Sequence, residues 1–304
     1  MGRIYFALTI CFTLLVLLFS PANASETLGV VVSIAPQKYF VDKIGGDRVT
    51  VSVMVKPGAS PAIYEPKPRQ MAGLTQAKIY FAVGVPFEGV WLEKIAGANP
   101  DMRVVHTDAG IVKIPMQAHH SHEQAPAGQD QAQNADHDHQ QPDPHIWLAP
   151  PLVKHQADAI LETLLRVDPA HRSSYEQRHQ KFLHELDELH EQLESLFAGK
   201  EDLEFMVFHP SWGYFAHTYG LRQVAIEIEG KAPKPAQLQE LIEYAKRHHI
   251  QAIFVQPQFS KKSAALIARE INARLVVVDP LAENWHENLK RVALELKSAM
   301  ERDN

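Results

Sequence analysis

Residues 171–200, HRSSYEQRHQKFLHELDELHEQLESLFAGK, decide the fold because they predict one long helix in the middle of the chain. Apolar side chains recur every three or four residues among Glu, Asp and His, which is the spacing of one helix face. Gly199 supplies a stop signal after the last turn. The apolar positions are Phe182, Leu186, Leu189, Leu193 and Leu196, and the helix also carries His179, His184 and His190, which we expect to face solvent.

Short apolar, β-branched runs lie on both sides of this helical region. Four precede it, at 28–34, 48–55, 77–84 and 102–106, and four follow it, at 204–209, 222–229, 251–256 and 274–279. Buried strands separated by segments long enough for a crossover indicate parallel sheets. The sequence therefore predicts an α/β fold of two Rossmann-like lobes, each with a four-stranded parallel sheet, joined by a long rigid connecting helix.

The domain boundaries follow from these patterns. We expect a signal peptide at 1–24, an N-terminal α/β lobe at 25–150, connecting helices at 151–199 and a C-terminal α/β lobe at 200–304. The first segment places one Arg ahead of an apolar run and ends in Ala22-Asn23-Ala24, a small-x-small cleavage site. Because the run is short for a membrane span, we expect cleavage after Ala24 and export of a soluble protein.

Composition excludes several classes of protein. Cys11 is the only cysteine and precedes the cleavage site, so the mature chain has no disulfide, no thiolate metal site and no Cys nucleophile. No HExxH, GxSxG, Walker or GxGxxG motif is present, so the sequence predicts no enzyme. The formal net charge is −6 with no stripe of Lys and Arg, which disfavours nucleic acid as a partner.

Six of the seventeen histidines lie within 118–150. Residues 117–143 contain no Val, Ile, Leu, Met, Phe, Trp or Tyr, so they have no apolar surface to offset the entropy of ordering. We predict that this segment is a disordered loop. Its histidines would bind metal ions weakly, in addition to a main metal site elsewhere in the chain. The histidines of this loop are His119, His120, His122, His137 and His139.

Candidate ligands follow the ends of predicted strands, where open α/β sheets present their ligands. His209 and Asp279 each end an apolar run and each precede a Pro, although hydrogen bonding at a loop end would also explain either residue alone. His145 returns to the core directly after the histidine-rich loop. Two imidazoles and a carboxylate suit zinc or a similar divalent ion better than calcium or magnesium. His106, at another strand end, is a further candidate.

Over essentially its whole mature length the chain resembles the metal-binding receptors of bacterial ABC importers, the group that includes ZnuA-like zinc receptors. The resemblance implies one metal ion in a cleft between two lobes, in a monomeric periplasmic receptor that delivers the ion to a membrane permease and its ATPase. The motifs that carry it are VVVSIAPQKYFVDKIGGDRVTVSVMVKPGASP at 30–61, YEPKP at 64–68, DPHIWLAP at 143–150, VFHPSWGYFAHTYGL at 207–221, IFVQPQFS at 253–260 and VVVDPLA at 276–282.

Position by position, the resemblance assigns metal ligation to His145, His209 and Asp279. A histidine at 209, where manganese-type relatives have Glu, implies Zn²⁺, and so does the long histidine-rich loop. One position departs from the family, because GASPA replaces the usual GASPH and Ala62 therefore stands where the first histidine ligand is expected. Glu65, a loop histidine or water remain candidates for the fourth ligand.

Four alternatives stay open at this point. The chain could be an exported zinc buffer or metallochaperone, a receptor for another divalent metal such as manganese, a metallohydrolase that uses an open coordination position beside Ala62, or a relative that has lost metal binding. If histidines hold the metal, affinity should fall as the pH drops through about 6 to 6.5, where unperturbed imidazoles protonate.

Overall fold

The computed structural model describes residues 27–116, 141–200, 203–228 and 230–300. The predicted signal peptide and the five histidines of the predicted loop lie outside these ranges. Within the described part of the chain, no helix combines the length and apolarity needed to cross a membrane.

The first lobe is a parallel sheet with the strand order β2-β1-β3-β4. Its edge strand β4 keeps its side chains half-buried or exposed, whereas every residue of β3 is buried. The strands are β1 (Leu28–Val32), β2 (Val49–Val53), β3 (Ile79–Ala82) and β4 (Arg103–His106), and the helices are α2 (Ala35–Gly45), α3 (Pro68–Gly73) and α4 (Pro86–Ala98), with short 3₁₀ turns at η1 (Gly46–Arg48) and η2 (Leu74–Gln76).

The second lobe repeats this topology, with the strand order β6-β5-β7-β8 and parallel pairing throughout. All eight strands fall within the predicted apolar runs, and the two-sheet prediction is confirmed. The strands are β5 (Glu204–Val207), β6 (Arg222–Ala225), β7 (Ala252–Val255) and β8 (Arg274–Val277), and the helices are α7 (Gly213–Thr218), α8 (Pro235–Arg247), α9 (Lys262–Glu270) and α10 (Trp285–Met300).

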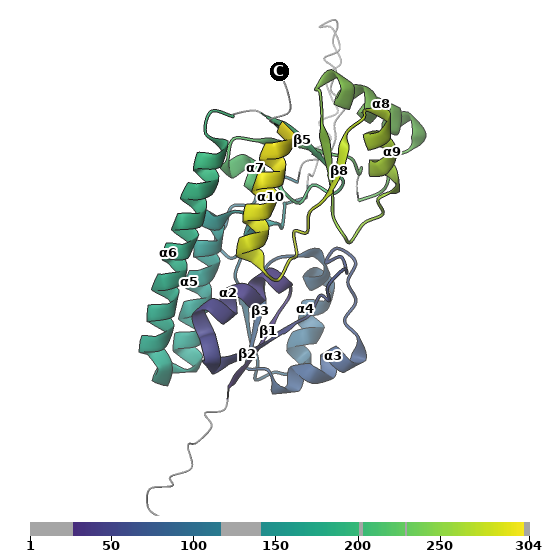
Figure 1. The fold of residues 1–304 in the computed structure, drawn as a ribbon. Coiled ribbons are helices and arrows are strands. Elements are labelled where there is room, and N and C mark those ends of the chain that lie inside the picture. Colours follow the sequence, from purple (N-terminus) through teal and green to yellow (C-terminus); the bar gives the residue numbers. More distant parts are fainter. Residues whose placement is uncertain (1–26, 117–140, 201–202, 229, 301–304) are drawn as a thin grey trace, which may run out of the picture.

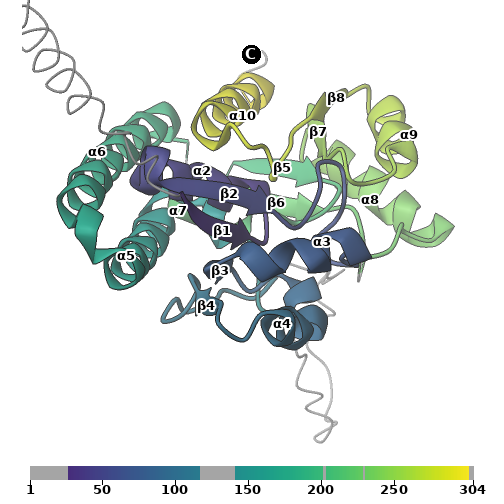
Figure 2. The same cartoon turned by 90° about the horizontal axis from the view of Figure 1, so that it is seen from below.

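The predicted connection is a pair of helices, α5 (Pro150–Val167) and α6 (Arg172–Phe197), which follow η3 (Ile146–Leu148) and are separated by η4 (Pro169–His171). They lie side by side along one edge of the molecule and reach both lobes, while α8 and α9 lie at the opposite edge (Figures 1 and 2). Each fully buried Leu of α6 contributes roughly 1.5–3 kcal/mol of hydrophobic stabilisation. The buried stripe ends at Phe197, and Leu196 is only half-buried.

One prediction about α6 was wrong. His179 is 3 % exposed rather than solvated, and its Nε2 lies 2.8 Å from Oδ1 of Asp158 on α5. It lies four residues after Tyr175 and three before Phe182, so it belongs to the apolar face against which α5 packs. His184 is exposed as predicted, and His190 is half-buried with its Nδ1 3.2 Å from the Tyr219 hydroxyl.

A continuous apolar core runs through both lobes. It includes Val30 of β1, Phe254 of β7 and buried residues of α5, α6 and α10. A second core lies beneath α8 and α9, against the other face of the second sheet. The connecting helices thus share their buried surface with both sheets, which makes the junction part of the core rather than a flexible linker.

Candidate metal centre

The segment that carries His145 is fixed by the chain on both sides. The backbone N–H of Asp143 donates to the carbonyl of Ile114 (2.8 Å), and Pro142 pairs with Pro115 in an antiparallel bridge. The hydroxyl of Tyr214 donates to the carbonyl of Asp143 (3.0 Å), and burial raises the pKa of this tyrosine to about 12, so it keeps its proton. The predicted disordered loop therefore ends before Asp143, which is 1 % exposed.

Asp143 orients the His145 ring. Its Oδ1 accepts from the backbone N–H of His145 (2.9 Å) and from the ring Nδ1 (2.7 Å). Because the carboxylate accepts the Nδ1 proton, the other ring nitrogen, Nε2, is left for a metal. Burial lowers the pKa of His145 below its ordinary value of 6.5, with the Asp143 charge opposing that shift. The imidazole is therefore neutral at neutral pH, the form that coordinates metals.

His209 is oriented in the same way from the second lobe. It lies two residues after Val207, the last residue of β5, and its Nδ1 donates to Oε1 of Glu227 (2.6 Å), a residue that is 4 % exposed. The side-chain amide of Gln256 brackets the His209 backbone, accepting from its N–H (3.2 Å) and donating to its carbonyl (2.6 Å). The ring stacks on Phe259 at 4.8 Å between centroids, which again leaves Nε2 available.

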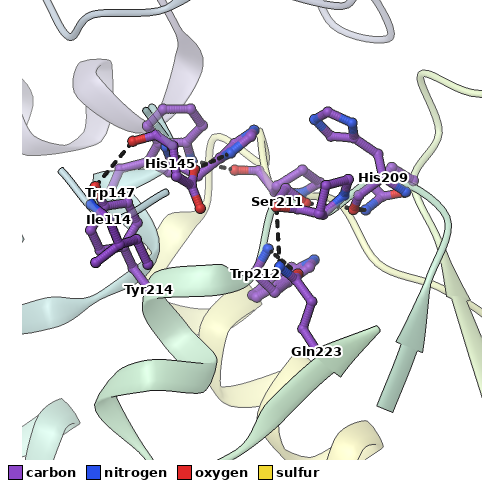
Figure 3. Close-up of polar contacts among 12 residues, drawn as sticks. Ile114, His145, Trp147, His209, Ser211, Trp212, Tyr214 and Gln223 are labelled. Atoms are coloured by element: carbon purple, nitrogen blue, oxygen red, sulfur yellow. Dashed lines mark hydrogen bonds and ion pairs between the residues drawn. The ribbon is translucent and has the colours of Figure 1, made fainter. Parts of the chain in front are cut away.

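The structure brings the two imidazoles together across the lobes. Their ring centroids lie 5.2 Å apart and the rings are inclined by 71°. Figure 3 shows both rings close to one another although they come from separate segments of the chain. A carboxylate that accepts the second ring N–H fixes the tautomer and raises the basicity of a metal-binding histidine, and here both histidines have such a carboxylate.

Asp279 lies two residues after Val277, the last residue of β8. Its Oδ1 accepts from Nε2 of Gln258 (2.8 Å) and from the backbone N–H of Leu281 (2.9 Å). Its carbonyl accepts from the side-chain amide of Asn288 (2.8 Å). The carboxylate is thus held by Gln258 and by the next turn of the chain, and the Asp279 backbone is held by α10.

Two tryptophans join the segment of Asp279 to that of His145. Nε1 of Trp147 donates to the carbonyl of Pro280 (2.8 Å), and Nε1 of Trp285 donates to the carbonyl of Trp147 (2.7 Å). Each indole is 1 % exposed. We call Trp147 and Trp285 the tryptophan pair, which links the residue after Asp279 to a residue two positions from His145.

The remaining predicted site residues are not gathered with the two histidines. Among the residues that the structure describes, no group of three or more His, Cys, Asp or Glu side chains is arranged to hold a metal ion. Glu65 and Ala62 are exposed, and the Nδ1 of His106 lies 3.5 Å from Oδ1 of Asp108.

Sequence reasoning missed the residues that orient the candidate ligands. Asp143 was assigned to the disordered loop, although its position two residues before His145 is a usable signal. Glu227 is the first acidic residue after β6, at the same sheet edge as His209, and this placement could also have identified it. Gln258 and Phe259 occupy the loop after β7 and carry no comparable signal.

The chain is similar to ZnuA proteins in both sequence and structure. The family model described as zinc-uptake complex component A, periplasmic (ZnuA) matches residues 30–299. The chain is 25 % identical over 265 residues to the high-affinity zinc uptake system protein ZnuA of Bacillus subtilis, covering 86 % of this chain and 81 % of the relative. A crystal structure of a ZnuA superposes with a TM-score of 0.82 at 41 % identity, covering 91 % of this chain and 100 % of that one.

A second solved structure, an internal-deletion mutant of ZnuA described as zinc-bound, also superposes with a TM-score of 0.82. It is 40 % identical to this chain, and the match covers 92 % of this chain and 100 % of that one. Both superpositions extend across the two lobes and the connecting helices, so the arrangement described above is that of solved relatives.

Proposed function

The chain belongs to the ZnuA family of periplasmic zinc-uptake components, and on that premise we propose that it is an exported receptor which captures Zn²⁺ between its lobes. It then delivers the ion, as a monomer, to an ABC permease and its ATPase in the membrane. The cycle is one of binding and release, with no bond chemistry, so the protein is not an enzyme.

The observation that carries this proposal is the pair of carboxylate-bound imidazoles. His145 and His209 come from different lobes, and each has a buried carboxylate on Nδ1 and an Nε2 without a hydrogen-bond partner among the described residues. Neutral imidazole nitrogens suit zinc, and carboxylate partners of this kind typically account for 10-fold to 100-fold of metal affinity. The zinc-bound relative supports Zn²⁺ as the ion carried.

We assign the third ligand to Asp279, whose segment the tryptophan pair ties to that of His145. The side chain of Ala62 has no donor atom, so we favour water or a histidine of the 118–141 segment in the fourth position. Glu65 is the remaining candidate, and its exposed position after Ala62 leaves it free to approach the cleft.

Isothermal titration calorimetry with Zn²⁺ tests the assignment. His209→Ala should lose most of the affinity, because it removes a ligand, whereas His184→Ala on the exposed face of α6 should bind as the unaltered chain does. Deleting residues 118–141 should mainly remove weaker binding equivalents. If the deletion abolishes tight binding and His209→Ala does not, the loop holds the zinc and the assignment is reversed.

The Glu65→Gln variant separates the candidates for the fourth ligand. A loss of affinity of about tenfold or more with the fold intact would give Glu65 a ligand role, since one protein ligand contributes at least that much. Unchanged affinity would leave water or a loop histidine.

A further inference from the structure

The two oxygens of the Asp279 carboxylate differ in their hydrogen bonds. Both of its side-chain hydrogen bonds fall on Oδ1, from the Gln258 amide at 2.8 Å and from the Leu281 N–H at 2.9 Å. A carboxylate oxygen has two lone-pair directions, and here each is directed at a donor. Oδ2 is left as the oxygen that can bind a cation without breaking a hydrogen bond.

The orientation of the Gln258 amide follows from its surroundings. Its Nε2 faces the carboxylate, while its Oε1 is buried and, among the described residues, has no hydrogen-bond partner. Turning the amide over would place Oε1 against the negative Oδ1, so the observed orientation is the one that electrostatics favours. The hydrogen bond to Oδ1 therefore leaves the side-chain carbonyl of Gln258 buried and unsatisfied, which costs free energy. A role in packing alone does not explain why a glutamine is placed here.

Gln258 belongs to a loop that organises both candidate ligands of the second lobe. Two residues earlier, Gln256 fixes the backbone of His209, and one residue later Phe259 stacks on the His209 ring. Gln258 has the corresponding role for Asp279, since its side-chain amide donates to the carboxylate. One short segment after β7 thus sets the orientation of an imidazole and of a carboxylate together.

We propose that Gln258 limits Asp279 to a single metal-binding oxygen and thereby favours zinc over manganese. This inference rests on the proposed function, because it takes Asp279 as a ligand. With Oδ1 occupied, the protein supplies three donors, the Nε2 atoms of His145 and His209 and Oδ2 of Asp279, and Ala62 adds none. Three donors and one further ligand make the four-coordinate site that zinc prefers.

Manganese has the opposite preference. It suits oxygen-rich, six-coordinate sites, and a carboxylate that binds through both oxygens supplies such a site with an additional donor. Without the Gln258 hydrogen bond, Oδ1 would keep only the Leu281 N–H and could turn one lone pair to the metal. Removing the amide should therefore raise the coordination number and improve manganese binding relative to zinc.

The test uses Gln258→Ala, and Gln258→Met, which keeps the length of the side chain without a donor. The matched control is Gln239→Ala, an exposed glutamine on α8 of the same lobe. Co²⁺ replaces zinc as a spectroscopic probe, since its visible absorption is intense in four-coordinate sites and weak at higher coordination. Zinc and manganese affinities are measured in parallel by competition calorimetry, and circular dichroism checks that each variant is folded.

The unaltered protein and the control should give intense Co²⁺ absorption. Both Gln258 variants should give weaker absorption, and the ratio of zinc to manganese affinity should fall about tenfold, the lower end of what an orienting residue contributes. Spectra and ratios identical to those of the unaltered protein would overturn the inference while leaving the receptor proposal standing. Unchanged zinc affinity in Asp279→Ala would also overturn it, whereas absence of zinc binding in the unaltered protein would overturn the proposed function itself.

Discussion

The His209 ring is oriented by the carboxylate of Glu227, which uses only one of its two oxygens for a hydrogen bond among the described residues. Oε1 of Glu227 accepts the Nδ1 proton at 2.6 Å, and Oε2 is buried without a hydrogen-bond partner among the described residues. Burying a carboxylate with one unsatisfied oxygen costs folding free energy, which the single hydrogen bond to the imidazole offsets only in part. The effect of this carboxylate is to hold the Nδ1 proton and the orientation of the ring, which leaves Nε2 to face a metal.

Glu227→Gln should therefore weaken zinc binding more than it changes stability. The amide keeps the size of the side chain but removes the charge, so we expect zinc affinity to fall about 10-fold to 100-fold. Calorimetry measures the affinity and urea unfolding the stability. Glu240→Gln, an exposed change on α8, is the control and should alter neither quantity. Equal zinc affinity in the two variants would remove the orienting role.

The pH dependence of zinc binding should reflect the lowered pKa of His145. Burial lowers the pKa of this imidazole below its ordinary value of 6.5, and His209 lowers it further. The charges of Asp143 and Glu227 raise the pKa and oppose that shift. Protons compete with zinc only where the ring takes one up. The loss of affinity due to His145 should therefore occur below pH 6.5, lower than expected for a free histidine.

Calorimetry between about pH 7.5 and about pH 5 checks this expectation, because zinc binding to a protonated histidine releases a proton. The unaltered protein should lose affinity more steeply below pH 6.5 than His145→Ala does, since the variant has one fewer competing proton site. Zinc affinity that stays constant over the whole range would contradict histidine ligation altogether.

At the same scale, four residues show how far the site could be predicted from the sequence. His145 and His209 could be chosen because strand ends and the return of a loop to the core place side chains at a sheet edge. The direction in which Asp279 points could not be predicted, since it depends on Gln258 and on a backbone N–H in the next turn. His179 was wrongly predicted to face solvent, because its charged neighbours in the sequence do not reveal that α5 packs against it.

Among the elements, the strands were predictable and the short helix α7 was not. Apolar β-branched runs mark a strand that is buried on both faces, whatever follows it. The six residues of α7 contain too little periodicity to identify a helix, yet they position the site, because Tyr214 and Gly213 both contact the Asp143 segment. Tertiary contacts, rather than local preference, determine this element.

Gly213→Ala should lower zinc affinity by displacing Asp143. A Cβ at this position would lie 2.6 Å from Oδ2 of Asp143, so the carboxylate has to move, and with it the His145 ring that it orients. We expect a loss of affinity of at least about tenfold, as for other changes to a residue that orients a ligand. Zinc calorimetry and thermal unfolding give the two measurements.

Gly89→Ala on α4 is the matched control, because a Cβ there meets nothing within 4 Å. In a helix it should stabilise the protein by roughly 0.5–1 kcal/mol and leave zinc affinity unchanged. If Gly213→Ala binds zinc as tightly as Gly89→Ala does, the contact with Asp143 does not govern the orientation of His145.

For the molecule as a whole, the important feature is that the two lobes share one core. The helices α2, α5, α6 and α10 pack against one another, and buried residues of both sheets belong to the same apolar cluster. Lys38 on α2 also pairs with Glu283, just before α10, at 2.9 Å. Opening the lobes as rigid bodies would expose much of this buried apolar surface, and its burial therefore opposes a wide hinge motion.

The tryptophan pair should set the distance between the two halves of the site. Trp285→Phe keeps an aromatic ring against Phe40, which packs edge-on at 5.1 Å, but removes the N–H that binds the carbonyl of Trp147. An unsatisfied buried carbonyl costs about 1–3 kcal/mol, so the free energy of unfolding should fall by about that amount. Zinc affinity should fall as well, because Trp147 keeps its own bond to the carbonyl of Pro280 but loses the second hydrogen bond that fixes it between the segments of His145 and Asp279.

A double-mutant cycle separates these two effects. In an Asp279→Ala background, Trp285→Phe should still reduce stability but should no longer reduce zinc affinity, because the ligand that it positions is absent. Trp91→Phe on α4, a half-buried indole outside the site, is the control and should leave affinity unchanged in both backgrounds. If the affinity loss persists without Asp279, the tryptophan pair stabilises the lobes generally and does not position the ligands. If it disappears, the indoles define the geometry that zinc meets when it enters between the lobes.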